Sequence, residues 1–148
     1  MEIRPAEEAD APAIAALLHE LGYPSNTDEA VSGRLTEWSG RDDLLVSVAA
    51  SGRRVVGVVA LAVIPYFERP GHWGRVVALV VDARLRGLGV GRRLLAAVER
   101  EALARGCVCM EISSSRKRAD AHAFYAALGY ADRCGESARF HKELIRAP

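Results

Sequence analysis

The sequence has few of the features that mark membrane, secreted or nucleic-acid-binding proteins. No apolar run approaches the ~20 residues that a helix needs to cross a bilayer. The 20 basic and 19 acidic residues leave a formal net charge of +1, so no overall charge favours nucleic acid or an anionic membrane as a partner. The N-terminus, MEIRPAEEAD, lacks the basic and then apolar order of a signal peptide, and we therefore expect a cytoplasmic protein.

Cysteine and histidine are scarce as well. The three cysteines are an odd number without a C-x-x-C pair, which does not suit a disulfide framework. Cys107 and Cys109 lie two residues apart in an apolar stretch, and we expect them to share one face of a strand as small core residues. The four histidines are scattered and form no H-E-x-x-H motif, so the sequence predicts no metal site.

The rest of the composition is ordinary for one globular domain. Half of the residues are hydrophobic and 26% are charged, as is typical of a folded protein. A chain of 148 residues can bury one core, but it is too short for a dinucleotide-binding domain and a separate substrate domain. We therefore predict a single domain over residues 1–148 with one active site.

Hydrophobic periodicity predicts alternating strands and helices that build a mixed sheet. A helix over 10–21 is followed by a second helix that begins at Asn26, where Glu29 completes a capping box, and runs to about Trp38. Apolar stretches at 44–50 and 54–64 predict an antiparallel hairpin. The other predicted elements are strands at 2–4, 76–81, 108–113, 130–134 and 138–145, helices at 90–103 and 119–128, and an aromatic loop at 65–73.

Residues 76–103 predict a buried strand, a glycine turn and an amphipathic helix. The strand over 76–81 is rich in β-branched residues, as are strands that are covered on both faces. Alternate glycines in the turn allow the backbone to approach a ligand closely. The helix then repeats apolar residues on one face, namely Val90, Leu94, Leu95, Val98 and Leu103.

The turn between this strand and this helix has the chemistry of an anion site. The first amides of a helix have no internal acceptor, and the helix dipole adds about half a positive charge there. Arg86, Arg92 and Arg93 add positive charge at the same end, which is unfavourable for the helix alone and favourable once a polyphosphate binds. A Walker loop is excluded because the turn lacks Gly-Lys-Ser/Thr, and a dinucleotide fingerprint would need glycine in place of Arg92.

The spacing Arg-x-x-Gly-x-Gly at 86–91 resembles the acyl-CoA loop of the Gcn5-related N-acetyltransferases. The resemblance implies that acetyl-CoA is the acyl donor and that the preceding strand separates from its neighbour. It also implies that Leu79, Val80 and Val81 line the pantetheine arm. The pyrophosphate would then be held by Arg86, Gly87, Leu88, Gly89, Val90, Gly91 and Arg92.

A second motif, from Ala121 to Tyr130, resembles the other diagnostic segment of this family, a short helix with Phe-Tyr followed by Leu-Gly-aromatic. With both motifs the resemblance covers nearly the whole chain, and it implies a strongly bent mixed α/β sheet with helices on both faces. The family tyrosine that matches Tyr125 protonates the departing thiolate, so Tyr125 is implied as the catalytic acid. A phenol with a pKa near 10 can do this and be reprotonated by solvent.

The sequence departs from the family pattern at two positions. Many relatives carry a glutamate base on the central strand, whereas this strand has Ala78 there and no carboxylate. Glu111 on the next strand is our candidate for the base, and His72 or an ordered water are the alternatives. Arg118 stands where many relatives have asparagine, and we expect it to contact coenzyme phosphate or an anionic substrate.

The acceptor is less well defined than the donor. The basic stretch Arg116-Lys117-Arg118 and the A-H-x-F-Y after it are similar to aminoalkylphosphonate N-acetyltransferases in this family, although a solvated basic turn is the other interpretation. The predicted function is acetyl transfer from acetyl-CoA to the primary amine of a small molecule, by direct attack in a ternary complex. The alternatives are a protein N-terminal or lysine acetyltransferase, a non-catalytic acyl-CoA sensor and a dinucleotide-dependent oxidoreductase. For the aromatic loop the alternatives are contact with the substrate, packing within the protein and a homodimer contact.

Overall fold

The computed structural model describes residues 1–114 and 118–145. The chain divides into two compact units, Met1–Ser113 and Ser114–Pro148, and each unit is described by itself below. No helix in the described part of the chain is long and apolar enough to cross a membrane.

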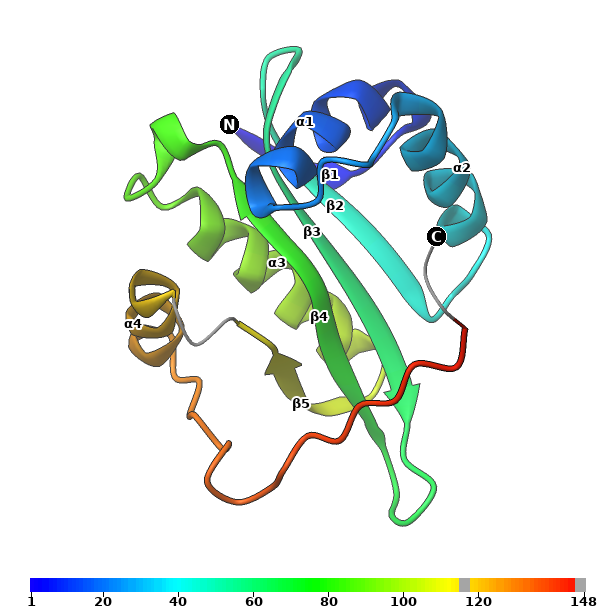
Figure 1. The fold of residues 1–148 in the computed structure, drawn as a ribbon, viewed down its shortest axis with the longest axis vertical. Helices are drawn as coiled ribbons and strands as arrows, with labels where there is room; N and C mark the ends of the chain where they lie inside the picture. Colours follow the sequence, from blue (N-terminus) through cyan, green and yellow to red (C-terminus); the bar gives the residue numbers. More distant parts are fainter. Residues whose placement is uncertain (115–117, 146–148) are drawn as a thin grey trace. The chain divides into compact units, whose positions relative to one another are not determined.

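The first unit is built on a five-stranded sheet whose strands lie side by side in chain order (Figure 1). Neighbouring strands are antiparallel except for the last pair, which is parallel. A parallel pair needs a long crossover, and the helix between the fourth and fifth strands provides it. The strands are β1 (Glu2–Pro5), β2 (Leu44–Ser51), β3 (Arg54–Pro65), β4 (His72–Val81) and β5 (Cys107–Ile112).

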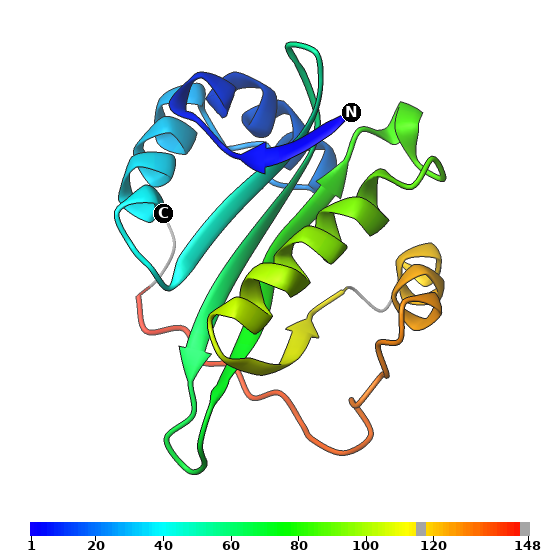
Figure 2. The same ribbon diagram turned by 180° about the vertical axis from the view of Figure 1, so that it is seen from behind.

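Helices cover both faces of this sheet, as predicted (Figures 1 and 2). Helices α1 (Ala11–Leu21) and α2 (Asp28–Ser39) lie on one face, and α3 (Val90–Ala104) lies on the other. Two short 3-10 turns, η1 (Glu8–Asp10) and η2 (Ala83–Leu85), precede α1 and α3 respectively. The second unit contains one helix among its described residues, α4 (Ala119–Ala127).

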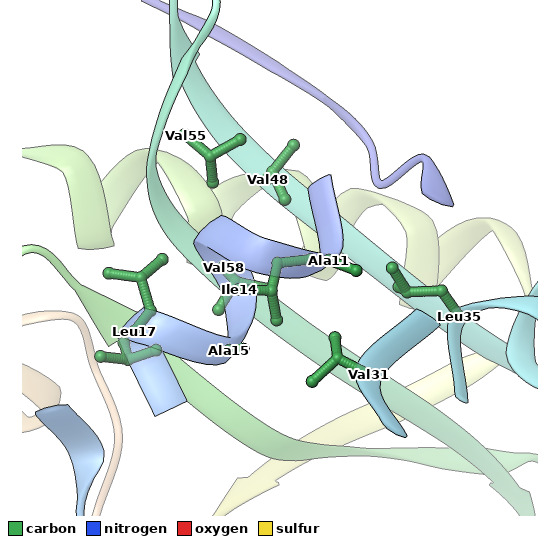
Figure 3. Close-up of a cluster of buried hydrophobic side chains, with 10 residues drawn as sticks. Ala11, Ile14, Ala15, Leu17, Val31, Leu35, Val48, Val55 and Val58 are labelled. Carbon is green, nitrogen blue, oxygen red and sulfur yellow. The ribbon is translucent and has the colours of Figure 1, made fainter. Parts of the chain in front are cut away.

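Each face of the sheet has its own apolar core. Figure 3 shows the core under α1 and α2, where Ile14, Val31 and Leu35 pack against Val48 and Val58 of the sheet. On the opposite face, α3 lies so close to β3 that a Cβ on Gly57 would come within 2.9 Å of the Leu94 side chain. The fully buried side chains of α3 include Leu94, Leu95 and Val98.

Two of the predicted apolar positions differ from expectation, and helix or strand geometry explains each. Leu103 is 72% exposed, whereas Ala102 is buried, because position 102 is one turn after Val98 and position 103 is turned away from that face. Cys107 is buried but Cys109 is exposed, since the register between β4 and β5 shifts by one residue between them. The two cysteines therefore do not share a face.

Some predicted boundaries were also wrong. The second helix begins at Asp28 rather than Asn26, because the hydroxyl of Thr27 accepts a hydrogen bond of 3.1 Å from the Ala30 amide. The loop predicted at 65–73 is shorter, since β3 extends to Pro65 and β4 already begins at His72. Pro70 and Gly71 occupy the hairpin connection, where ladder hydrogen bonds are not needed, and Pro65 is the last residue of β3.

No strand forms at 130–134 or 138–145, where two were predicted. These residues have no partner strand among the described residues, and β-branched or aromatic side chains form a strand only when a neighbour completes its hydrogen bonds. Phe140, Leu144 and Ile145 are accordingly more than four-fifths exposed.

Candidate active site

The central feature of the first unit is that β4 and β5 separate partway along their length. β5 pairs with β4 from His72 to Val76, and the last pair joins Val76 to Ile112. β3, in contrast, stays paired with β4 as far as Val81. Between residues 77 and 81, the edge of β4 that faces away from β3 therefore has no partner strand among the residues that the structure describes (Figure 1).

A bulge marks the point of separation. Ala60 of β3 pairs with Ala78 and Leu61 pairs with Val76, so Val77 is an extra residue without a partner on β3. Its side chain is 49% exposed. Bulges often occur beside active sites, because they end regular pairing and turn a strand edge toward a ligand.

The open edge suits an extended ligand that carries amide groups. Val80 is buried in the core under α1, which fixes the strand, while Leu79 and Val81 are half-buried. The unpaired backbone groups of this segment can therefore accept an additional strand-like chain, as in β-strand addition to a sheet edge. Leu79, Val80 and Val81 are the residues that were predicted to line a pantetheine arm, and they occupy this edge.

Asp82 fixes the position of the loop that leaves β4. Its carboxylate accepts 2.8 Å hydrogen bonds from the guanidinium groups of both Arg54 and Arg84, and one of 3.0 Å from the Arg84 amide. These hydrogen bonds, those from Arg84 above all, hold the pKa of the Asp82 carboxyl well below its ordinary value. Because Arg54 begins β3, the ion pairs connect the loop to the sheet.

The glycine turn that follows is open to a ligand. Gly87 and Gly89 have φ angles of 80° and 84°, and a Cβ on either residue would have no atom within 4 Å. The first i to i−4 hydrogen bond of α3 runs from the Arg93 amide to the Gly89 carbonyl, at 3.1 Å. The N–H groups of Val90, Gly91 and Arg92 therefore have no i−4 carbonyl acceptor in the helix, and no side chain caps the helix.

The charges around this turn favour an anion. Arg86 and Arg92 are exposed, and no acidic residue occupies the first turn of α3. Arg93 is used differently, because its guanidinium donates a hydrogen bond of 3.0 Å to the Met1 carbonyl. Uncompensated basic residues at the positive end of a helix dipole destabilise the helix. Together with the outward amides, they fit a pyrophosphate group.

The candidate base Glu111 lies on the exposed part of β5. It is in register with Arg75 of β4, and paired residues direct their side chains to the same face of a sheet. This face is the one covered by α1 and α2, since the neighbouring Gly74 faces Ala102 of α3. His72 lies at the far end of β4 from the bulge and packs against Gly106, a position that argues against its role as the base.

The second unit contains the candidate acid. Tyr125 is half-buried in α4, with its ring 5.4 Å from that of Phe124 and 6.1 Å from that of Tyr130. Burial raises the pKa of the Tyr125 phenol, and the nearby positive charge of Arg118 partly offsets this effect. Arg118 occupies the N-cap position of α4. The predicted basic residues Arg116 and Lys117 lie outside the described residues.

A separate open groove of about 1000 Å³ runs between α2 and the start of α1. It is lined by residues such as Glu8, Pro12 and Ser32, and by none of the residues predicted to act in catalysis or coenzyme binding. The β4 edge and the glycine turn therefore carry the candidate site, and the groove does not.

Comparisons with known proteins agree with this geometry. The model of the acetyltransferase (GNAT) family matches residues 12–130. The chain is 31% identical over 134 residues to an aminoalkylphosphonate N-acetyltransferase of Salmonella typhimurium, covering 87% of this chain and 84% of the relative. It is 33% identical over 137 residues to glucosamine 6-phosphate N-acetyltransferase 1 of Oryza sativa subsp. japonica, covering 88% of this chain and 81% of the relative.

A solved structure shows the same fold. The aminoglycoside N-acetyltransferase AAC(6')-Iy, in complex with a bisubstrate analogue of CoA and acetylneamine, superimposes with a TM-score of 0.82. The match covers 97% of this chain and 98% of that one at 21% sequence identity.

Proposed function

The chain belongs to the acetyltransferase (GNAT) family and is an acetyl-CoA-dependent N-acetyltransferase, and we propose that it acetylates the primary amine of a small molecule. The observation that carries the proposal is the open edge of β4 over residues 77–81, which leads directly to the glycine turn at 86–91. An extended arm along this edge and a pyrophosphate on the turn would be continuous, as they are in coenzyme A.

The residues of the first unit would hold the donor. Backbone groups of Leu79, Val80 and Val81 would pair with the amides of the pantetheine arm. Amides of the turn 87–92, together with the exposed guanidinium groups of Arg86 and Arg92, would bind the pyrophosphate. Acetyl-CoA then supplies an acetyl group activated as a thioester, and the protein's task is to position an amine against it.

The transfer requires one bond to form and one to break. The neutral amine nitrogen attacks the thioester carbonyl carbon, the carbon–sulfur bond breaks, and the coenzyme leaves as a thiolate. The nitrogen, which is positively charged once the new bond forms, releases a proton to water, and the acid that protonates the thiolate regains its own proton from solvent. We assign Tyr125 as the acid that protonates this thiolate, because it occupies the tyrosine position of the family's Phe-Tyr motif and a phenol is protonated at neutral pH. The acceptor ammonium must first lose a proton, and Glu111 is our candidate for taking it, directly or through water.

A small-molecule acceptor is supported by the relatives. Two of the curated relatives are named for an aminoalkylphosphonate and for glucosamine 6-phosphate, and both compounds are small primary amines that carry an anionic phosphorus group. The match covers more than four-fifths of each relative, so the chain spans nearly the same domain as they do.

A thiol-release assay tests the proposal. Purified protein and acetyl-CoA are mixed with each amine of a panel, and release of the free coenzyme thiol is followed with a chromogenic disulfide that reacts with thiols. We expect acceptor-dependent thiol release with at least one small primary amine and a product acetylated on nitrogen by mass spectrometry. If only peptide N-termini or lysine side chains are acetylated, the small-molecule assignment is wrong; if no amine is acetylated although acetyl-CoA binds, the acyl-CoA sensor is the better interpretation.

A further inference from the structure

Arg75 lies on β4 just before the strand separates from β5. Its guanidinium donates a hydrogen bond of 2.8 Å to the hydroxyl of Ser113. Ser113 directly follows Ile112, which forms the last pair between the two strands. The positive charge of Arg75 is therefore held at the opening between β4 and β5, on the face covered by α1 and α2.

This positive charge has no negative partner in residues 1–114 and 118–145. Glu111 is directly across from Arg75 in the sheet register, yet the two side chains form no ion pair within 4.0 Å. Arg4 and Arg54 of the same unit, in contrast, pair with the carboxylates of Asp10 and Asp82. The guanidinium is solvent-accessible and keeps donors beyond the one that Ser113 uses, so it can bind an anionic group of a ligand.

The position of Arg75 is also near the expected reacting end of the donor. Residues 77–81 span roughly 16 Å at about 3.3 Å per residue. A coenzyme whose pyrophosphate binds the turn at 86–91 would run back along this edge, and its thioester would lie near the bulge at Val77. Arg75 is two residues from that bulge and reaches across to Ser113.

We propose that Arg75 is the residue that selects acceptors with a phosphonate or phosphate group, by binding that group while the amine faces the thioester. The proposal rests on the proposed function, and it narrows the acceptor from primary amines to anionic primary amines. The planar guanidinium can donate two parallel hydrogen bonds to such an oxyanion. Glu111, on the same face, is then placed to meet the ammonium end of the acceptor.

The test compares two acceptors of similar size, 2-aminoethylphosphonate and n-propylamine. In the wild-type protein we expect a lower KM for the phosphonate. Arg75→Met should raise that KM roughly 10- to 100-fold, because a charge-assisted interaction is lost, and should leave the KM for propylamine within about twofold. Arg75→Lys keeps the positive charge but lacks the planar guanidinium, so its KM for the phosphonate should lie between those of the wild type and Arg75→Met.

Arg53→Met is the matched control, since Arg53 is an exposed arginine in the turn between β2 and β3 and should change neither KM. Calorimetric titration of 2-aminoethylphosphonate into protein saturated with CoA measures binding without turnover. If the wild type binds 2-aminoethylphosphonate and Arg75→Met binds it at least tenfold more weakly, the role of Arg75 is supported. This holds even if the compound is not acetylated, and in that case only the proposed function fails. Equal binding by both proteins, or no preference of the wild type for the phosphonate, would overturn the role of Arg75.

Discussion

Tyr125 is the residue for which the chemistry and the local surroundings agree most directly. A general acid must carry its proton when the thiolate leaves, and a phenol does so at neutral pH because its pKa is ordinarily near 10 and burial raises the pKa of Tyr125 further. Its ring contacts the aromatic rings of Phe124 and Tyr130. Removing the hydroxyl alone therefore tests catalysis while the packing of the ring is kept.

We expect Tyr125→Phe to lower the single-turnover rate of acetyl transfer by about 10²–10⁴, the usual contribution of positioned acid catalysis. Coenzyme affinity should change little, because the ring remains. Rapid mixing with a saturating acceptor is the appropriate measurement, since slow product release can hide the effect in steady-state kcat.

Tyr23→Phe is the control for the loss of a phenolic hydroxyl, because Tyr23 is 61% exposed and lies after α1, outside the proposed site. A Tyr125→Phe protein that transfers acetyl groups at the wild-type single-turnover rate would show that Tyr125 only packs. Water or another group would then have to protonate the thiolate.

Arg75 illustrates what sequence patterns do not reveal about single residues. In the sequence it precedes an apolar run and resembles an ordinary residue at the end of a strand. Its significance depends on where β5 stops pairing with β4 and on its hydrogen bond to Ser113, and both are features of the tertiary structure. The one signal was a lone charge in a stretch otherwise typical of a buried strand.

At the level of elements, the turn between β4 and α3 combines two properties that suit contact with a ligand. Gly89 is in the left-handed region with φ of 84°, and the helix that it caps lacks a side-chain cap. Both properties make sense if the backbone of the turn contacts the coenzyme.

Gly89→Val tests this interpretation. A β-branched residue at this φ costs about 1–3 kcal/mol of strain, and its side chain would occupy the open space beside the turn. We expect the dissociation constant for acetyl-CoA to rise at least about tenfold while circular dichroism still reports a folded protein. Isothermal titration with acetyl-CoA gives the constant directly.

Gly40→Val is the comparison, since Gly40 also has open space around its Cβ position but a φ of −85° at the end of α2. This variant should keep wild-type coenzyme affinity. Unchanged affinity in a folded Gly89→Val protein would mean that the turn does not bind the pyrophosphate.

Elements with strong periodicity could be predicted from the sequence, and elements that depend on distant partners could not. α1 and α3 begin and end close to the predicted residues because apolar spacing and terminal glycines define them locally. The glycine turn was located for the same reason. The strands predicted at 130–134 and 138–145 fail because a strand needs a neighbour, and composition alone does not provide one.

At the level of the whole molecule, two buried aspartates connect separate parts of the first unit. Asp10 accepts hydrogen bonds of 2.8 and 2.9 Å from Arg4 and so joins the start of α1 to β1. Asp82 joins the loop after β4 to Arg54 at the start of β3. Both carboxyls are less than 8% exposed, and hydrogen bonds from arginine lower the pKa of each.

These lowered pKa values predict how stability depends on pH. A carboxyl whose pKa is lower in the folded state contributes stability that is fully present above its unfolded pKa of about 4, and that is lost as the pH falls through the folded pKa. The protein should therefore be less stable at pH 2–3 than at pH 6, even though its net charge near neutrality is small.

Asp10→Asn should remove one of these contributions. At pH 7 we expect it to lower the free energy of unfolding by about 1–3 kcal/mol, because two charge-assisted hydrogen bonds are weakened in a largely buried site. Urea unfolding of both proteins at pH 7, 5, 3 and 2 measures the difference. The difference should be constant above about pH 5 and should shrink as the pH falls further, because the wild-type carboxyl then becomes protonated as well. Asp43→Asn is the control, because Asp43 forms an exposed ion pair with Arg41 and its loss should change stability little at any pH. If the free energy of unfolding of Asp10→Asn stays below that of the wild type by the same amount down to pH 2, the loss comes from packing and not from the ionised pair.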